Sequence, residues 1–166
     1  MNTNTIEPTS QPSVSNERSA ENFAERAPEY SIYKPNARGN GGVIRWGLNR
    51  AKGCIFVEAA AQSGEKQFDW ENKIIMKWGL SDIGTILATL QGRQSQGKLF
   101  HQSEKANSSA DLTYRDDPER APYLLSISRQ ETSDKSLKKV MIPISHSEVA
   151  ILEIALQQAV KNILDW

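Results

Sequence analysis

The chain is poor in the residue types on which most catalytic and metal sites depend. It has one cysteine and two histidines among 166 residues. The single Cys54 excludes an internal disulfide and a cysteine-based zinc site, and neither His101 nor His146 has a partner at ligand spacing. The motifs GxGxxG, GxSxG and HExxH and the P-loop are absent, and no pair of acids stands in apolar surroundings. We therefore expect no enzyme activity, no metal or cofactor, and no small-molecule substrate.

Long hydrophobic runs are also missing. No apolar stretch approaches the roughly 20 residues that a membrane-spanning helix needs, so we expect no membrane association. A hydrophobic content of 38% suffices for one core. Residues 1–29 are rich in Ser, Thr, Asn, Glu and Pro and can bury little surface. We therefore expect a disordered N-terminal tail at 1–29 and a single domain at 30–166.

An overall excess of one charge is absent too, because 20 basic and 20 acidic residues give a net charge of zero. Their distribution is uneven. Residues 1–29 contain five acids and two bases, residues 30–100 contain ten bases and five acids, and residues 101–166 contain eight bases and ten acids. This asymmetry favours one basic working face in the first half of the domain, although ordinary solvated surface charges would give the same counts.

The sequence does contain a strand-then-helix pattern that occurs twice. In the first unit a long strand expected at 68–78 leads into an amphipathic helix capped by Ser81. In the second unit Ser145 and Glu148 form an S-x-x-E capping box that opens a helix at 145–164. Pro143 lacks an amide donor, so we expect the strand before this helix to lie at a sheet edge or to end there. The other strand candidates are 30–34, 42–48, 52–59, 97–102, 110–115, 122–129 and 137–144.

The predicted helix at 145–164 has a wide apolar face. Its main stripe consists of Val149, Leu152, Leu156, Val160 and Ile163, and Ile151, Ala155 and Ala159 widen it. One thin sheet does not need so much covering surface. We therefore expect this helix to pack against another copy of the chain as well.

Aromatic and basic residues are interleaved along the first unit. Single-stranded nucleic acid is held by a basic track for its phosphates and by aromatic faces on which unpaired bases stack. The candidate nucleic-acid-binding residues are Tyr33, Lys34, Arg45, Trp46, Lys52, Lys66, Phe68, Trp70, Lys73 and Lys77. The alternative for Phe68, Trp70 and Trp78 is that they belong to the core, since they fall on the apolar side of the predicted strand.

Seven segments stand out when their order and spacing are considered together. They are YSIYK at 30–34, KQFDWE at 66–71, LSDIGTIL at 80–87, LFHQ at 99–102, PYLLSIS at 122–128, IPISHSEVAIL at 142–152 and ILDW at 163–166. In order and rough spacing they resemble segments of the Whirly family of single-stranded DNA-binding proteins. The resemblance implies an α+β fold with two antiparallel four-stranded β-sheets, each followed by an α-helix. It also implies a homotetramer with the helices at its centre, and single-stranded DNA or RNA passing between the sheets of neighbouring subunits.

The chain departs from the family in its first strand. The family motif there is K-G-K-A-A-L-S, whereas here Lys34 matches the first lysine and PNARGNGG follows. In the family this motif contributes to DNA binding and to the assembly of tetramers into larger particles. The N-terminal residues do not have the composition of an organelle transit peptide or a secretory signal, so we expect a bacterial or phage-like cytoplasmic protein.

The function that the resemblance implies is sequence-tolerant binding of single-stranded DNA in repair, replication or transcription regulation. Two alternatives stay open. One is an RNA-binding protein of the same fold, similar to the guide-RNA-binding proteins, because stacking alone does not separate RNA from DNA. The other is a scaffold that binds protein through its sheets, which the zero net charge would suit.

Overall fold

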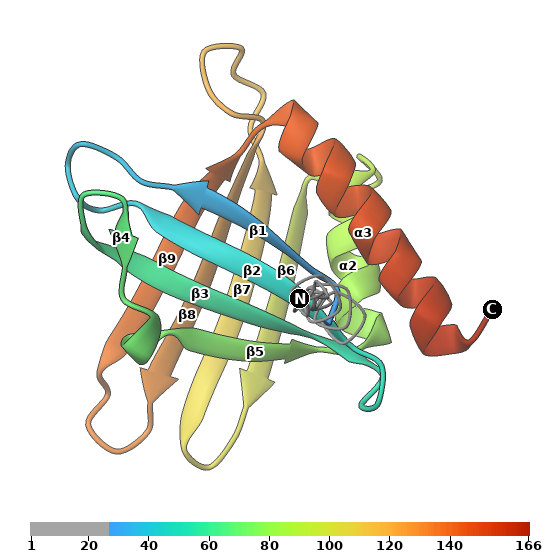
Figure 1. The fold of residues 1–166 in the computed structure, drawn as a ribbon, viewed down its shortest axis with the longest axis horizontal. Helices are drawn as coiled ribbons and strands as arrows, with labels where there is room; N and C mark the ends of the chain where they lie inside the picture. The colour runs from blue at the N-terminus through green and yellow to red at the C-terminus, as the bar shows by residue number, and fades with distance from the viewer. Residues whose placement is uncertain (1–26) are drawn as a thin grey trace, which may run out of the picture.

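The computed structural model describes residues 27–166. The first unit consists of β1 (Glu29–Lys34), β2 (Gly42–Asn49), β3 (Cys54–Gly64), β4 (Gln67–Phe68), the 3-10 helix η1 (Trp70–Asn72), β5 (Ile74–Trp78) and α2 (Leu80–Leu90). The second consists of β6 (Gln96–Gln102), β7 (Ala106–Tyr114), β8 (Tyr123–Glu131), β9 (Leu137–Ile144) and α3 (His146–Leu164). Figure 1 shows the two sheets stacked with their strands crossing and both helices on the same side.

The first sheet is antiparallel in the order β1-β2-β3, and both β4 and β5 pair with the far side of β3. It therefore has four strand positions, the fourth shared by two short strands. The register places Ile32, Ile44, Ala59 and Ile74 side by side, and all four are buried. Because successive residues of a strand point to opposite faces, this row defines the inward face of the sheet.

The single long strand expected at 68–78 is wrong. The chain interrupts its pairing after β4, makes the turn η1, and resumes pairing at Ile74. Asp69 holds this turn, because its carboxylate accepts hydrogen bonds from the backbone and side-chain amides of Asn72 at 3.3 and 2.9 Å. Such local side-chain bonds compete with a regular strand. Within β5 the expected alternation is present, with Ile74, Met76 and Trp78 buried.

The second sheet is antiparallel in the order β6-β7-β8-β9. β9 lies at its edge, which confirms the position inferred from Pro143. One inward row joins Leu99, Ala110, Ile127 and Val140, and all four are buried. The predicted fold class, α+β with two antiparallel four-stranded sheets each followed by a helix, is confirmed.

The core lies between the inward faces of the two sheets. At Gly42 the backbone of β2 comes directly against β9, since a Cβ there would lie 2.6 Å from Cγ1 of Val140 and 3.4 Å from Cγ2 of Ile142. A larger residue at this position would force the sheets apart. The absence of a side chain at one point of β2 is therefore a condition for the close packing of the whole core.

The two helices begin differently from one another. The predicted capping box of α3 is confirmed: Ser145 Oγ accepts from the Glu148 amide at 3.3 Å, and Glu148 accepts from the Ser145 amide at 3.1 Å. The prediction of Ser81 as the cap of α2 is wrong. Gly79 is the cap, and its amide donates to the Asp82 carboxylate at 3.0 Å, so that the helix begins at Leu80.

Most of the tail predicted at 1–29 lies outside the described residues. β1 begins at Glu29, one residue before the predicted start of the domain. Neither α2 nor α3, nor any other helix within residues 27–166, has the length and apolar character needed to cross a membrane.

The fold predicts that Tyr123→Phe destabilises the chain. The buried hydroxyl of Tyr123 donates to the carbonyls of Thr89 and Leu90, at 2.9 and 3.3 Å, and so joins β8 to the end of α2. Leaving these carbonyls without their donor should lower the free energy of unfolding by about 1–2 kcal/mol. Urea unfolding at neutral pH measures this loss.

The matched control is Tyr114→Phe. The Tyr114 ring lies 5.4 Å from that of Tyr123, but it is half-exposed, and its hydroxyl has no hydrogen-bond partner among the described residues. We expect its unfolding free energy to stay within about 0.5 kcal/mol of the unmodified chain. An equal loss in both variants would show that the buried hydroxyl has no special role.

Candidate nucleic-acid interface

Most of the predicted binding residues lie on the outward face of the first sheet. Since Ile32 and Ile44 point inward, their neighbours Tyr33 and Arg45 point outward. Arg45 lies in register with Glu58, and Glu58 with Ile75. The register thus brings together, on one surface, side chains that are widely separated in the sequence.

Two aromatic rings form an open platform at one end of this surface. The ring centroids of Tyr33 and Phe68 lie 5.6 Å apart with an interplanar angle of 56°. Tyr33 is 52% exposed, and Phe68, on β4 beside β3, is half-buried. Exposed aromatic faces of this kind can receive an unpaired base.

A second aromatic group lies over the middle of the sheet. The Arg45 guanidinium lies 4.2 Å from the centroid of the Trp70 ring, which the turn η1 presents. Arg45 also pairs with Glu58 at 3.4 Å, and Lys73 pairs with the same carboxylate at 2.8 Å. Two cations thus share Glu58, and Arg45 also lies 3.7 Å from Glu29. Arg45 and Lys73 are fixed in position, but much of their charge is already compensated.

Three other predicted cations have no such partner. Lys52, Lys66 and Lys77 are exposed, and within residues 27–166 no carboxylate lies in salt-bridge range of any of them. The ammonium of Lys52 lies 5.4 Å from the centroid of the Phe56 ring. These lysines can neutralise phosphates without first breaking an ion pair.

Lys34 has a different role from the other predicted cations. Its ammonium forms an ion pair with Glu148, the carboxylate that also caps α3. Burial would raise the pKa of Glu148, but hydrogen bonds from Lys34 and Ser145 outweigh it and hold the pKa below its ordinary value of 4.5. Lys34 therefore fastens β1 to the start of α3.

Trp46 does not belong to the outward surface. It lies on the inward face of β2, is 3% exposed, and stacks on Tyr30 with 6.3 Å between the centroids. Its ring cannot receive a base from solvent in this position. Trp78 is likewise buried, in agreement with the alternative that assigned it to the core. Phe68 and Trp70, which the same alternative assigned to the core, are instead half-buried on the outward side.

The second sheet has an exposed aromatic residue that the predicted site did not include. Phe100 is 65% exposed on the outward face, in a row with Ser109, Ser128 and Lys139. The alternation of Leu99 inward and Phe100 outward was the signal that could have identified it. No group of three or more His, Cys, Asp or Glu side chains within residues 27–166 is placed to hold a metal ion.

Comparison with known proteins links this geometry to one family. The family model described as "Whirly transcription factor" matches residues 18–155. The mitochondrial single-stranded DNA-binding protein WHY2 of Arabidopsis thaliana is 21% identical over 120 residues, which are 69% of this chain and 50% of that protein. The chloroplastic single-stranded DNA-binding protein WHY1 of Solanum tuberosum is 23% identical over 146 residues, 85% of this chain and 49% of that protein. The chain thus spans about half the length of these relatives.

Solved structures have the same fold. The crystal structure of WHY1 from Arabidopsis thaliana matches with a TM-score of 0.70 at 17% identity and covers 86% of this chain and 88% of that one. A guide-RNA-binding protein complex bound to its RNA contains a chain with a TM-score of 0.61 at 17% identity, covering 84% of this chain and 94% of that one.

The expected bacterial or phage-like cytoplasmic location is wrong. The curated relatives are plant proteins named as mitochondrial or chloroplastic.

The Lys34–Glu148 contact predicts a specific dependence of stability on pH. Because the pKa of Glu148 is lower in the folded chain, its stabilisation is fully present above the unfolded value near 4.5 and is lost as pH falls through the folded pKa. At pH 7, Glu148→Gln should therefore lower the free energy of unfolding, by about 1 kcal/mol or less for a contact near the surface. At pH values below the folded pKa of Glu148, the unmodified chain and the variant should have the same free energy of unfolding. Urea unfolding across this pH range measures both values.

Glu104→Gln is the matched control, since Glu104 lies in an exposed loop and its carboxylate has no described partner. This variant should leave the dependence of the unfolding free energy on pH unchanged. Lys34→Met should reproduce the loss seen in Glu148→Gln, and the double variant should lose little more. Additive losses would mean that the two residues act independently.

Proposed function

The chain belongs to the Whirly family, and on that premise we propose that it binds single-stranded DNA on the outward face of its first sheet, without readout of base sequence. The observation that carries the proposal is the gathering of Tyr33, Phe68 and the Arg45–Trp70 pair on one exposed surface that is bordered by unpaired lysines. Bases would stack on the rings, and phosphates would lie along Lys52, Lys66 and Lys77.

Stacking and phosphate contacts explain why binding would tolerate different sequences. Every base has a π-face, so an aromatic platform does not distinguish one base from another. Phosphate contacts carry no sequence information either. A protein of this kind suits processes that expose single strands, and the repair, replication or regulation of transcription of DNA are the roles we propose.

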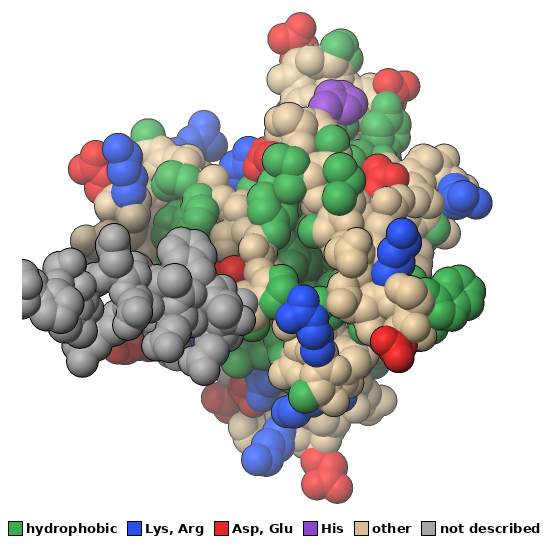
Figure 2. Space-filling model, turned by 45° about the vertical axis from the view of Figure 1, so that its right-hand side comes forward, with side chains coloured by type: hydrophobic (Ala, Val, Ile, Leu, Met, Phe, Trp, Pro, Cys, Tyr) green, Lys and Arg blue, Asp and Glu red, His purple; other side chains and the backbone are tan. Residues whose placement is uncertain are grey.

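The side of the molecule that bears the helices supports the proposal of a homotetramer. Figure 2 shows hydrophobic side chains at the surface on this side. On α3, Ile151 and Ile154 are 52% and 66% exposed, whereas Val149, Leu152 and Leu156 are buried against the sheets. Large aliphatic side chains adjacent on one helix face are a suitable surface for contact with other copies of the chain.

The DNA proposal predicts that Tyr33→Ala combined with Phe68→Ala weakens binding of an oligothymidine by at least about tenfold, because each stacked base contributes roughly 1–3 kcal/mol. Phe100→Ala, which removes an exposed ring from the other sheet, should change affinity by less than about twofold. Fluorescence anisotropy over a salt series is the measurement.

Lys66→Ala with Lys77→Ala should reduce the slope of log K against log salt by about 1.4, whereas Lys105→Ala with Lys161→Ala should not.

Two results would contradict the proposal. One is unchanged affinity in the Tyr33–Phe68 variant, and the other is a duplex bound as tightly as the single strand. An RNA oligomer of the same length tests the remaining alternative. Tighter binding of that RNA than of DNA would favour the RNA-binding function.

The assembly proposal predicts that Ile151→Glu with Ile154→Glu dissociates the tetramer to smaller species, because it places charges in an apolar contact. Sedimentation velocity at micromolar concentration measures the mass. Gln157→Glu, at an exposed position of the same helix, should leave the mass unchanged. A monomeric unmodified chain, or a double variant that stays tetrameric, would rule out this contact.

A further inference from the structure

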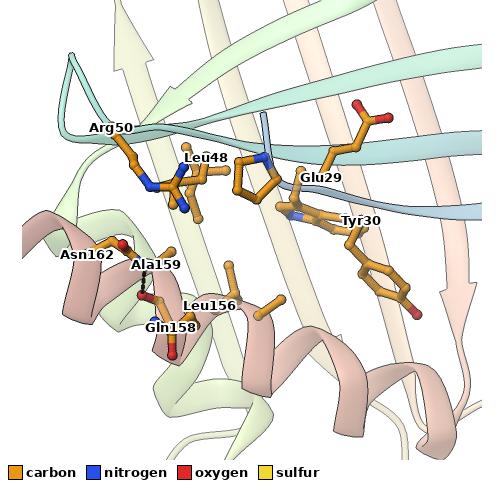
Figure 3. A pocket seen from close by; sticks show the side chains of 12 residues that line it. Glu29, Tyr30, Leu48, Arg50, Leu156, Gln158, Ala159 and Asn162 are labelled. Atoms are coloured by element: carbon orange, nitrogen blue, oxygen red, sulfur yellow. Dashed lines mark hydrogen bonds between the residues drawn. The ribbon is translucent and has the colours of Figure 1, made fainter. Parts of the chain in front are cut away.

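An open cavity lies on the side of the first sheet opposite to the proposed DNA interface. Its volume is about 260 Å³, and it is bounded by the ends of β1 and β2 and by the C-terminal half of α3. Leu48, Leu156 and Ala159 contribute apolar walls (Figure 3). Ile55 also lines the cavity. A space of this size accommodates one or two fused aromatic rings.

An aromatic wall closes the cavity on the β-sheet side. Tyr30 and Trp46 both line the cavity, and their rings are stacked at an angle of 22°. The Nε1 atom of Trp46 is buried and has no hydrogen-bond acceptor among the described residues. The cavity therefore offers a ligand the ring surfaces of Tyr30 and Trp46, and not the closed-off indole N–H of Trp46.

The charge at the mouth of the cavity is positive. Figure 3 shows the Arg50 side chain extending from the end of β2 toward the cavity, whereas the carboxylate of Glu29 points away from it. Glu29 lies 3.7 Å from Arg45, on the other face of the sheet. The polar residues from α3, Gln158 and Asn162, are uncharged. The cavity is therefore suited to an apolar molecule that carries a negative charge.

We propose that this cavity binds a small aromatic carboxylate, with its rings between α3 and the Tyr30–Trp46 wall and its carboxylate near Arg50. The ligand would occupy the inward side of the sheet, so its binding does not require DNA. This site would join the sheet to the helix through which we propose that the tetramer assembles.

The test uses 2-naphthoate as the probe and the indole N–H signals of the four tryptophans in a ¹⁵N–¹H spectrum of the full chain. Trp46→Phe identifies the Trp46 signal. Titration should shift that signal more than the other three and give a dissociation constant of about 100 μM. The cationic analogue, 2-naphthylmethylammonium, should bind at least about tenfold more weakly because of Arg50.

Two variants locate the site. Ala155→Phe fills the cavity and should weaken naphthoate binding at least about tenfold, whereas Gln157→Phe, two residues away on an exposed side of α3, should not. Arg50→Met, at an exposed position, should weaken it several-fold without affecting folding. Thermal unfolding confirms that each variant is folded.

Three outcomes would overturn the proposal. They are no shift of the Trp46 signal, equal binding of the ammonium analogue, and unchanged binding in Arg50→Met. A Trp46 signal that shifts with protein concentration alone, and that the probe then fails to move, is a case of the first outcome and would show that a second copy fills the cavity. None of these results bears on the DNA proposal, which the Tyr33–Phe68 variant tests separately.

Discussion

The close contact between β2 and β9 is the constraint on which the rest of the molecule depends. With no side chain at Gly42, the first sheet lies directly against Val140 and Ile142, so its inward face must be apolar and continuous. Alternation along the strands then sends every second residue outward. The surface on which Tyr33 and Arg45 meet is the necessary other side of this core, and Trp46 is excluded from it for the same reason.

Local signals in the sequence predicted the elements well, and contacts between distant residues account for what was missed. The capping box at Ser145 and the edge position of Pro143 depend only on neighbouring residues or on a missing amide, and both predictions are confirmed. The interruption of the strand at Asp69 was not predicted. The apolar and polar residues around it alternate as in a regular strand, although the Asp69 side chain caps a turn. The partner of Lys34 is 114 positions away, and no pattern along the chain could have paired it with Glu148.

The ion pairs on the outward face divide its cations into two groups with respect to the proposed phosphate contacts. Arg45 and Lys73 both contact Glu58, so a phosphate that approaches either must compete with a carboxylate that is already in place. What these pairs provide is rigidity: Arg45 is held over Trp70 and supports its ring. In the proposed function these tasks fall to different residues: Arg45 positions the Trp70 ring, and the unpaired lysines would attract the strand.

β1 connects this surface to the helix-bearing side of the molecule. Tyr33 and Lys34 are adjacent but point to opposite faces, so that one forms the platform while the other pairs with Glu148. The same carboxylate accepts the Ser145 amide at the start of α3, and Ile151 and Ile154 follow within the next three turns. One side chain therefore sets how the helix leaves the sheets. One ion pair thus links β1, which carries Tyr33 of the proposed DNA surface, to α3, which carries the helix face that we propose joins the subunits.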